Sequence, residues 1–172
     1  MKRLILMRHA KAMIGESGQA DRDRALSPRG FRDVMAMANI LAQHTPLPDR
    51  ILCSSARRTR ETLAALLPSL NANFDATVAD ALYDTTQTTY ADIIKTFAGP
   101  GNVVLIIGHN PTIHATAANL VGSGPNDQLA LLSAGFPTAS LAIMDFRDSD
   151  WTQLQPGSGI LMGFFSPREK RA

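Results

Sequence analysis

The chain has very little cysteine, no long apolar run and no large excess of charge of either sign. It contains one cysteine in 172 residues, which excludes an internal disulfide framework and favours a reducing compartment. No stretch approaches the roughly 18–20 apolar residues that a membrane-spanning helix needs. Arg8 interrupts the first apolar run before it reaches the length of a signal-peptide core. We therefore expect a cytoplasmic protein without a membrane partner.

The charge balance argues against a nucleic-acid partner. The sequence has 17 Lys and Arg residues against 15 Asp and Glu residues, a formal net charge of +2. A general nucleic-acid binder needs basic residues clustered on one face. Residues 168–171 form a short basic tail, which we interpret as a frayed, solvated end. The sequence gives no indication of oligomeric state.

Length and patterning predict one α/β domain over residues 1–172, which is long enough to bury a sizeable core. Helical and strand patterns alternate, which is typical of a three-layer α/β/α sandwich around a mostly parallel sheet. The predicted helices cover residues 28–43, 56–67, 88–97 and 111–121, and the predicted strands cover residues 4–7, 50–53, 74–78, 103–107, 139–146 and 159–165. Ser54-Ser55 is predicted to cap the second helix, and residues 80–84 are predicted to form a loop. Cys53 is expected to be a small buried residue of a strand.

The first predicted strand ends in an Arg-His pair. Four apolar residues, Leu4–Met7, run directly into Arg8 and His9, and ligand sites in open parallel sheets gather at the carboxyl ends of strands. Imidazole can be a nucleophile, a base or a metal ligand near neutral pH. A guanidinium presents a fork of donors that suits phosphate. The alternative interpretation is a solvated pair at a strand exit.

Two further strands end in similar groups. Residues 54–58 supply two serines and two arginines, and residues 108–110 supply a Gly-His-Asn sequence. If the three strands are parallel neighbours, their ends meet at one rim of the sheet. Imidazoles and guanidiniums crowded there would be costly without an anion, and a phosphoryl group would compensate their charge. The alternative is that the strands are not neighbours and the residues never meet.

These three segments, in this order, resemble the motifs of the histidine phosphatase superfamily, which also contains the phosphoglycerate mutases. They correspond to its Arg-His-Gly signature, its Ser-x-x-x-Arg-Ala-x-x-Thr motif and its late Gly-His motif, and are found here at Met7–Ala10, Ser54–Thr62 and Gly108–Pro111. The resemblance spans about residues 3–145 and implies a phosphoglycerate mutase-like fold. Ala10 departs from the usual glycine, which is acceptable if its φ is negative.

A fourth segment, Arg24–Gly30, resembles the Arg-x-Leu-Thr-x-x-Gly sequence of the SixA-type phosphohistidine phosphatases. The compact length fits this small branch, because it leaves little room for a substrate lid. Arg24 is a weaker candidate for the rim of a phosphate pocket.

The resemblance implies a role for each matching residue. His9 would attack phosphorus and become phosphohistidine, Arg8 and Arg58 would bind phosphoryl oxygens, and His109 would contribute a further donor. Neighbouring guanidiniums would lower the pKa of the nucleophile and keep it neutral, and they would stabilise the charge of the transferring group without Mg²⁺ or another cofactor. The motif places its arginine four residues after Ser54, so we predict a surface or ion-pairing role for the adjacent arginine at position 57.

A metal site is the alternative for the histidines. His9, His109 and His114 could be ligands, but His109 and His114 are five residues apart, whereas helical neighbours meet at three or four. No thiolate or carboxylate motif completes a site. We therefore predict no metal.

The sequence contains no obvious general acid. Asp80 and Asp84 are possible acids between the second and third motifs, although loop solvation or helix capping would explain each of them. Imidazole leaves without a strong acid, whereas an alkoxide needs one. The predicted activity is therefore hydrolysis of phosphohistidine on partner proteins. The alternatives are a phosphatase or mutase of small phosphate esters, with Asp80 or Asp84 as acid, and a module that binds phosphorylated partners without turnover.

Overall fold

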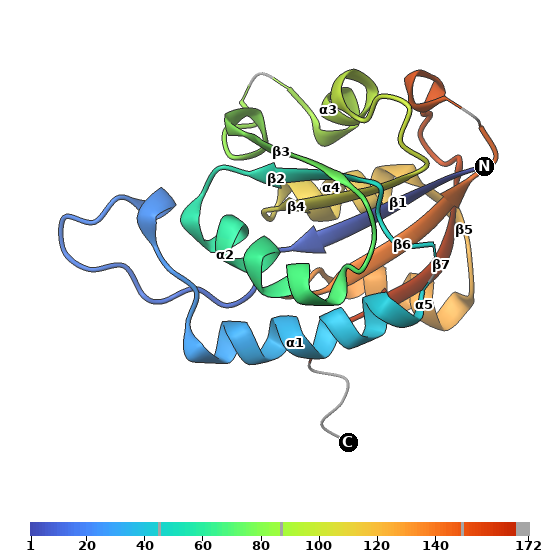
Figure 1. Cartoon of the computed structure of the whole chain (residues 1–172). Helices are drawn as coiled ribbons and strands as arrows, with labels where there is room; N and C mark the ends of the chain where they lie inside the picture. The colour runs from blue at the N-terminus through green and yellow to red at the C-terminus, as the bar shows by residue number, and fades with distance from the viewer. Residues whose placement is uncertain (45, 87, 149, 168–172) are drawn as a thin grey trace.

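The fold is built on one mixed sheet. The computed structural model describes residues 1–44, 46–86, 88–148 and 150–167, and in this part of the chain seven strands have the order β3-β2-β4-β1-β6-β7-β5 (Figure 1). The strands are β1 (Lys2–Arg8), β2 (Arg50–Ser54), β3 (Asp75–Ala79), β4 (Val103–Gly108), β5 (Val121–Ser123), β6 (Leu141–Phe146) and β7 (Gly159–Phe165). The β1–β6 and β6–β7 pairs are antiparallel and the others are parallel. The predicted mostly parallel sheet is confirmed.

Helices cover both faces of the sheet. They are α1 (Pro28–Gln43), α2 (Arg57–Leu66), α3 (Tyr90–Phe97), α4 (Thr112–Leu120) and α5 (Asn126–Ala134). Because successive side chains of a strand point to opposite faces, Ile5 and Met7 pack in the core under α1 and α2. Leu4 and Leu6 pack in a second core with α3, α4 and α5. The three-layer sandwich is confirmed. None of the described helices is long and apolar enough to cross a membrane.

Helix α1 shows how the sequence determines an element. Ser27 caps it, since its Oγ accepts a hydrogen bond from the Gly30 N–H at 3.0 Å, and proline occupies the first helical position. Four residues at helical spacing are buried against the sheet, namely Val34, Met37, Ala38 and Leu41. Phe31 and Met35, which also fit the helical period, lie half exposed on the outer side. The basic tail at 168–171 lies outside the described residues.

Several predicted details are wrong. Neither Ser54 nor Ser55 caps α2, which follows Ala56 without a side-chain cap, because both hydroxyls bond to other segments. The predicted loop at 80–84 begins with a short 3₁₀ turn, η3 (Asp80–Leu82). Strand β5 and helix α5 were not predicted. Cys53 is buried in β2 as expected, and burial raises the pKa of its thiol to about 12.

The strand order brings the three motif-bearing ends together. Strands β2, β4 and β1 are consecutive in the sheet, and Arg8 pairs with Gly108 while Cys53 pairs with Ile107. Residues that follow these positions therefore emerge side by side at the carboxyl edge, on the left of Figure 1. The alternative in which the three ends never meet is excluded.

Gly30 allows close contact between α1 and the segment after β1. A Cβ at this position would lie 2.3 Å from the Lys11 carbonyl oxygen. We expect Gly30→Ala to destabilise the protein by about 1–3 kcal/mol, because backbone must move to relieve the clash. The free energy of unfolding in urea measures this. Asn39→Ala, at an exposed position of the same helix, should change stability by less than about 0.5 kcal/mol. Equal effects of the two substitutions would contradict the close contact.

Candidate active site

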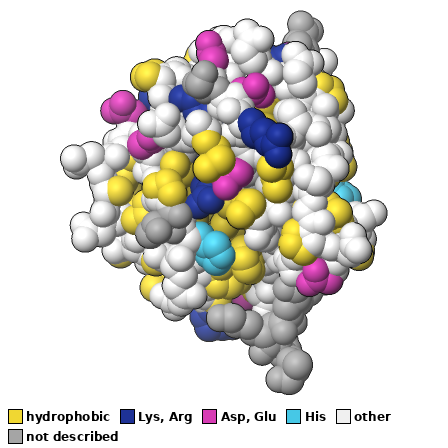
Figure 2. Space-filling model, turned by 90° about the vertical axis from the view of Figure 1, so that its right-hand side faces the viewer, with side chains coloured by type: hydrophobic (Ala, Val, Ile, Leu, Met, Phe, Trp, Pro, Cys, Tyr) yellow, Lys and Arg dark blue, Asp and Glu magenta, His cyan; other side chains and the backbone are white. Residues whose placement is uncertain are grey.

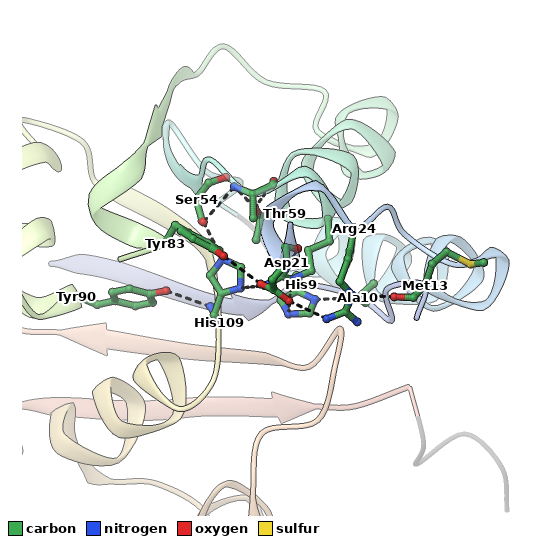
Figure 3. A network of polar contacts seen from close by, with 12 residues as sticks. His9, Ala10, Met13, Asp21, Arg24, Ser54, Thr59, Tyr83, Tyr90 and His109 are labelled. Atoms are coloured by element: carbon green, nitrogen blue, oxygen red, sulfur yellow. Dashed lines mark hydrogen bonds and ion pairs between the residues drawn. The ribbon is translucent and has the colours of Figure 1, made fainter. Parts of the chain in front are cut away.

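The candidate active site is an open polar cavity at the carboxyl edge of the sheet. Its volume is about 790 Å³, and Arg8, His9, Arg58 and His109 all line it. His9 follows β1, His109 follows β4, and their ring centroids lie 5.1 Å apart. Arg58 lies in the first turn of α2. The four residues that the sequence assigned to phosphate chemistry are therefore together in the structure, and Figure 3 shows His9 and His109 pointing toward each other.

The imidazole of His9 is held in one tautomer. Its Nδ1 lies 2.7 Å from the carbonyl oxygen of Ala10, and because a carbonyl only accepts, Nδ1 carries the proton. The lone pair is therefore on Nε2, which accepts a hydrogen bond from Arg58 Nε at 3.3 Å. His9 is 9% exposed. Ala10 itself has a negative φ, since Ala139 is the one described non-glycine residue with a positive φ.

The guanidinium of Arg58 contacts Asp21 with one edge and faces His9 and His109 with another. At the end of the group, Nη1 donates to the Asp21 carbonyl oxygen at 2.7 Å and Nη2 donates to Asp21 Oδ2 at 2.9 Å. Along the side, Nε faces His9 and Nη2 lies 3.4 Å from His109 Nδ1. The side edge is thus directed between the two imidazoles, where a phosphoryl group would meet a pair of N–H donors.

His109 is positioned by hydrogen bonds to its side chain and to its backbone. Its Nε2 lies 2.7 Å from Ser54 Oγ. Its backbone N–H donates to the hydroxyl of Tyr90, which in turn donates to the Leu82 carbonyl oxygen at 2.8 Å. The preceding residue must be glycine, because a Cβ on Gly108 would lie 2.4 Å from the Tyr90 oxygen. Figure 3 shows Tyr90 and Ser54 on either side of His109.

Both imidazoles are neutral at physiological pH. The pKa of His9 is lowered to about 3, above all by burial, with smaller contributions from His109, Arg58 and Arg8, while the hydrogen bond to Ala10 opposes the shift. Burial and the Arg58 charge lower the pKa of His109 to about 4. A neutral imidazole with its lone pair directed into the cavity can act as a nucleophile.

The carboxyl groups that line the cavity are held ionised. Burial acts to raise the pKa of Asp21, but hydrogen bonds from Arg24 and Arg58 lower it to about 2. Hydrogen bonds from Ser55 and Arg22 lower the pKa of Asp80, and hydrogen bonds from Thr86 lower that of Asp84. The two aspartates that the sequence offered as possible acids thus line the cavity as carboxylates and not as proton donors.

Of the remaining residues considered from the sequence, one lines the cavity and two lie outside it. Arg24 lines the cavity, where its Nη1 donates to Asp21 Oδ1 at 2.9 Å. Arg57 points outward and pairs with Glu61 at 2.7 Å. His114 bonds to the Leu132 carbonyl oxygen at 2.8 Å and does not join the other two histidines. Among the described residues no group of three or more His, Cys, Asp or Glu side chains is placed to hold a metal ion.

Among the residues of the site that were not predicted, Asp21, Tyr83 and Ser54 contact the predicted ones directly. Asp21 joins Arg58, Arg24 and Tyr83, whose hydroxyl donates to Asp21 Oδ2 at 3.1 Å. The only signal for Asp21 was its position three residues before Arg24. Ser54 was interpreted as a helix cap, although it is the first residue of the second motif and contacts His109.

Comparisons with known proteins agree with this geometry. Residues 4–98, which include Arg8, His9 and Arg58, match the family described as the histidine phosphatase superfamily (branch 1). The chain belongs to the histidine phosphatase superfamily. An uncharacterized protein of Mycobacterium tuberculosis is 34% identical over 164 residues, which cover 94% of this chain and 100% of the relative.

Solved structures place this member of the superfamily in the SixA-type branch. A SixA protein of Agrobacterium tumefaciens is 32% identical, with a TM-score of 0.77, and the match covers 96% of this chain and 98% of that one. A SixA protein of Nakamurella multipartitia is 30% identical, with a TM-score of 0.73 and coverage of 96% of both chains. The fold is therefore that of the phosphoglycerate mutase-like enzymes, and the protein is a phosphatase.

The low pKa of His9 predicts that activity persists in acid while the stability of the fold decreases there. The acidic limb of kcat/KM should lie near pH 3–4 instead of near 6.5, because His9 stays neutral down to its own pKa of about 3. In the unfolded chain His9 regains a pKa near 6.5. The unfolded state therefore binds more protons between these values, and the free energy of unfolding should fall as pH decreases below about 6.5, by about 1.4 kcal/mol per pH unit for each such histidine.

Urea unfolding at pH 7, 6 and 5 measures how the free energy of unfolding depends on pH. His9→Asn removes one titrating group and should reduce the slope of stability against pH, whatever its effect on stability at pH 7. An unchanged slope, or an acidic limb of activity near pH 6.5, would contradict the lowered pKa.

The position of Arg58 predicts unequal effects of two adjacent arginines. Arg58→Ala should reduce kcat/KM for p-nitrophenyl phosphate by about 10²–10³-fold, because it removes donors directed at the phosphoryl site. Arg57→Ala breaks an exposed ion pair and should change kcat/KM by less than about threefold. Arg58→Lys keeps the charge but not the paired N–H donors and should stay well below the wild type. Similar losses at positions 57 and 58 would disprove the assigned register.

Proposed function

We propose that the protein hydrolyses phosphohistidine on partner proteins through a covalent phospho-His9 intermediate. The observation that carries the proposal is the pairing of a neutral imidazole nucleophile with carboxylates that are held ionised. Asp21, Asp80 and Asp84 all line the cavity with lowered pKa values. A site without a protonated carboxyl group suits a leaving group that needs little help, and imidazole is such a group.

In the first step His9 Nε2 attacks phosphorus and the phosphorus–nitrogen bond of the substrate breaks. The substrate imidazole leaves as a neutral molecule when its other ring nitrogen carries a proton. His9 keeps its own proton on Nδ1, hydrogen-bonded to Ala10. Arg8 and the side edge of Arg58 bind the phosphoryl oxygens.

In the second step water attacks phosphorus, its two protons stay on the oxygens of the phosphate that forms, and the bond to Nε2 breaks. The electron pair returns to Nε2, so His9 leaves as a neutral imidazole. His109 donates to a phosphoryl oxygen once its proton resides on Nδ1, and the Ser54 hydroxyl can then donate to Nε2 across the 2.7 Å contact. Neither step needs a metal or another cofactor. We place the activity in the cytoplasm because of the single, buried cysteine.

The names of related proteins support this substrate class. The SixA proteins of A. tumefaciens and N. multipartitia are named for phosphohistidine phosphatase activity. A structure of the protein histidine phosphatase SixA with tungstate shares the fold, at 23% identity and a TM-score of 0.72.

Turnover of matched substrates tests the proposal. A phosphohistidine peptide and activated aryl phosphates should be hydrolysed far faster than alkyl phosphates, and rates across the aryl series should fall steeply as the pKa of the leaving group rises. Asp80→Asn and Asp84→Asn should leave phosphohistidine turnover nearly unchanged. His9→Ala should abolish turnover and the acid-labile phosphoenzyme seen with labelled substrate.

A loss of about 10²-fold or more on alkyl esters in either Asp variant, with little loss on activated aryl esters, would identify a working general acid. The protein would then be a phosphatase of small esters instead. Binding of phosphohistidine peptide with no turnover and no phosphoenzyme would favour a module that only recognises phosphorylated partners.

A further inference from the structure

A second hollow opens beside the phosphoryl pocket. It has a volume of about 320 Å³ and is lined by Arg8, Lys11, Arg29, Asn110, Phe136, Pro137 and Thr138. Four of these residues, Arg8, Lys11, Asn110 and Thr138, also line the active-site cavity. The two hollows are therefore adjacent, and Arg8 is one of the residues that border both.

The lining of the second hollow contains three cations and no carboxylate. Arg29 pairs with Asp33 at 3.5 Å across one helical turn, which compensates part of its charge, but Asp33 does not line the hollow. Lys11 forms no ion pair with the described residues. The first turn of α1, which contains Arg29, has no acidic residue, so its N–H groups and dipole add to the positive potential.

The opposite end of the sheet has a different charge pattern. Figure 2 shows this face, on which hydrophobic side chains gather near the middle and Lys or Arg side chains lie among Asp and Glu. Single-sign charge at the second hollow is therefore a local property, although the formal net charge of the whole chain is only +2.

The backbone around the hollow is built to hold its cations in place. The Lys11 carbonyl oxygen accepts hydrogen bonds from both the N–H and the Oγ of Ser27, at 2.8 and 2.9 Å. Gly30 lets α1 approach this carbonyl closely. Lys11, from the segment after β1, and Arg29, from α1, are thus brought to the same hollow. On the other wall the Phe136 carbonyl oxygen accepts from Arg8 Nη1 and Asn110 Nδ2, both at 3.0 Å.

We infer that this hollow is a second anion subsite, which binds a carboxylate or phosphate group that the substrate carries close to its phosphoryl group. The inference rests on the proposed function in one respect, that the phosphoryl group occupies the cavity around His9. Arg8 would then contact both anions, while Lys11 and Arg29 would contact the second. The second anion can come from an acidic residue that flanks phosphohistidine in a polypeptide, or from a second acidic group on a small molecule.

Binding of phosphonates with and without a carboxylate tests the subsite without any turnover. Calorimetry compares methylphosphonate with phosphonates that carry a carboxylate on one to three methylene groups. For the best spacing we expect the carboxylate to tighten binding by about tenfold, because it gains partly exposed charge contacts with Lys11 and Arg29. In the double variant Lys11→Met/Arg29→Met the ratio of the two affinities should fall close to one.

Arg32→Met is the matched control. It removes one positive charge from α1, the helix that carries Arg29, at an exposed position that lines neither hollow, and it should keep both the affinity ratio and the wild-type activity. No preference for the carboxylate at any spacing, or an equal loss of preference in Arg32→Met and in the double variant, would overturn the inference.

Substrate pairs then identify the source of the second anion. One pair is a phosphohistidine peptide with Glu or Gln beside the modified residue, and the other is carboxyphenyl phosphate against phenyl phosphate. A preference for Glu that the double variant loses supports a polypeptide source, and a preference confined to the small acid supports a small molecule. If phosphohistidine peptides are not hydrolysed while the phosphonate preference persists, the proposed function fails and the subsite stands. If they are hydrolysed with no preference in any pair, the subsite fails alone.

Discussion

The guanidinium of Arg58 joins the three segments that make up the site. One edge holds Asp21 from the long loop after β1, and the other faces His9 and His109 at the ends of β1 and β4. Arg58 is 7% exposed, so a charge of this kind needs partners to be buried at acceptable cost. Asp21 supplies the counter-charge on the outer edge and leaves the inner edge to neutral groups. The site is therefore prepared for an anion without being filled by one of its own carboxylates.

The same arrangement explains the protonation states. Two imidazoles beside Arg8 and Arg58 cannot both be protonated without repulsion, and burial lowers both pKa values further. A bound phosphoryl group changes this balance, because its charge favours an additional proton on the imidazole that must donate. The Ser54 hydroxyl, which can donate or accept, is compatible with either state of His109.

Strand ends could be predicted from the sequence because apolar runs and alternating elements determine the topology, and parallel topology determines which ends meet. The assignment of Arg58 over Arg57 followed from the register of the resembling family motif, whose arginine lies four residues after its serine. Asp21 and Tyr83 could not be predicted in the same way, because they lie in connecting segments with short 3₁₀ turns, which carry no helical or strand period. Helix α5 buries only Leu132, so it carries no amphipathic pattern. The cap predicted at Ser54 was wrong because tertiary contact with His109 takes precedence over a local preference.

The hydrogen bond from His9 Nδ1 to Ala10 makes the tautomer of His9 insensitive to changes in the loops around the cavity. The acceptor belongs to the next residue in the chain, so it moves with the histidine when the surrounding loops move. The tautomer of His9, the proposed nucleophile, is thus fixed by its own neighbour in the chain and does not depend on the residues proposed to bind the phosphoryl group. Substitutions in the loops can weaken anion binding while leaving the reactive nitrogen unprotonated. Substitutions around the cavity can therefore alter which substrate binds without changing the tautomer of His9, the proposed nucleophile.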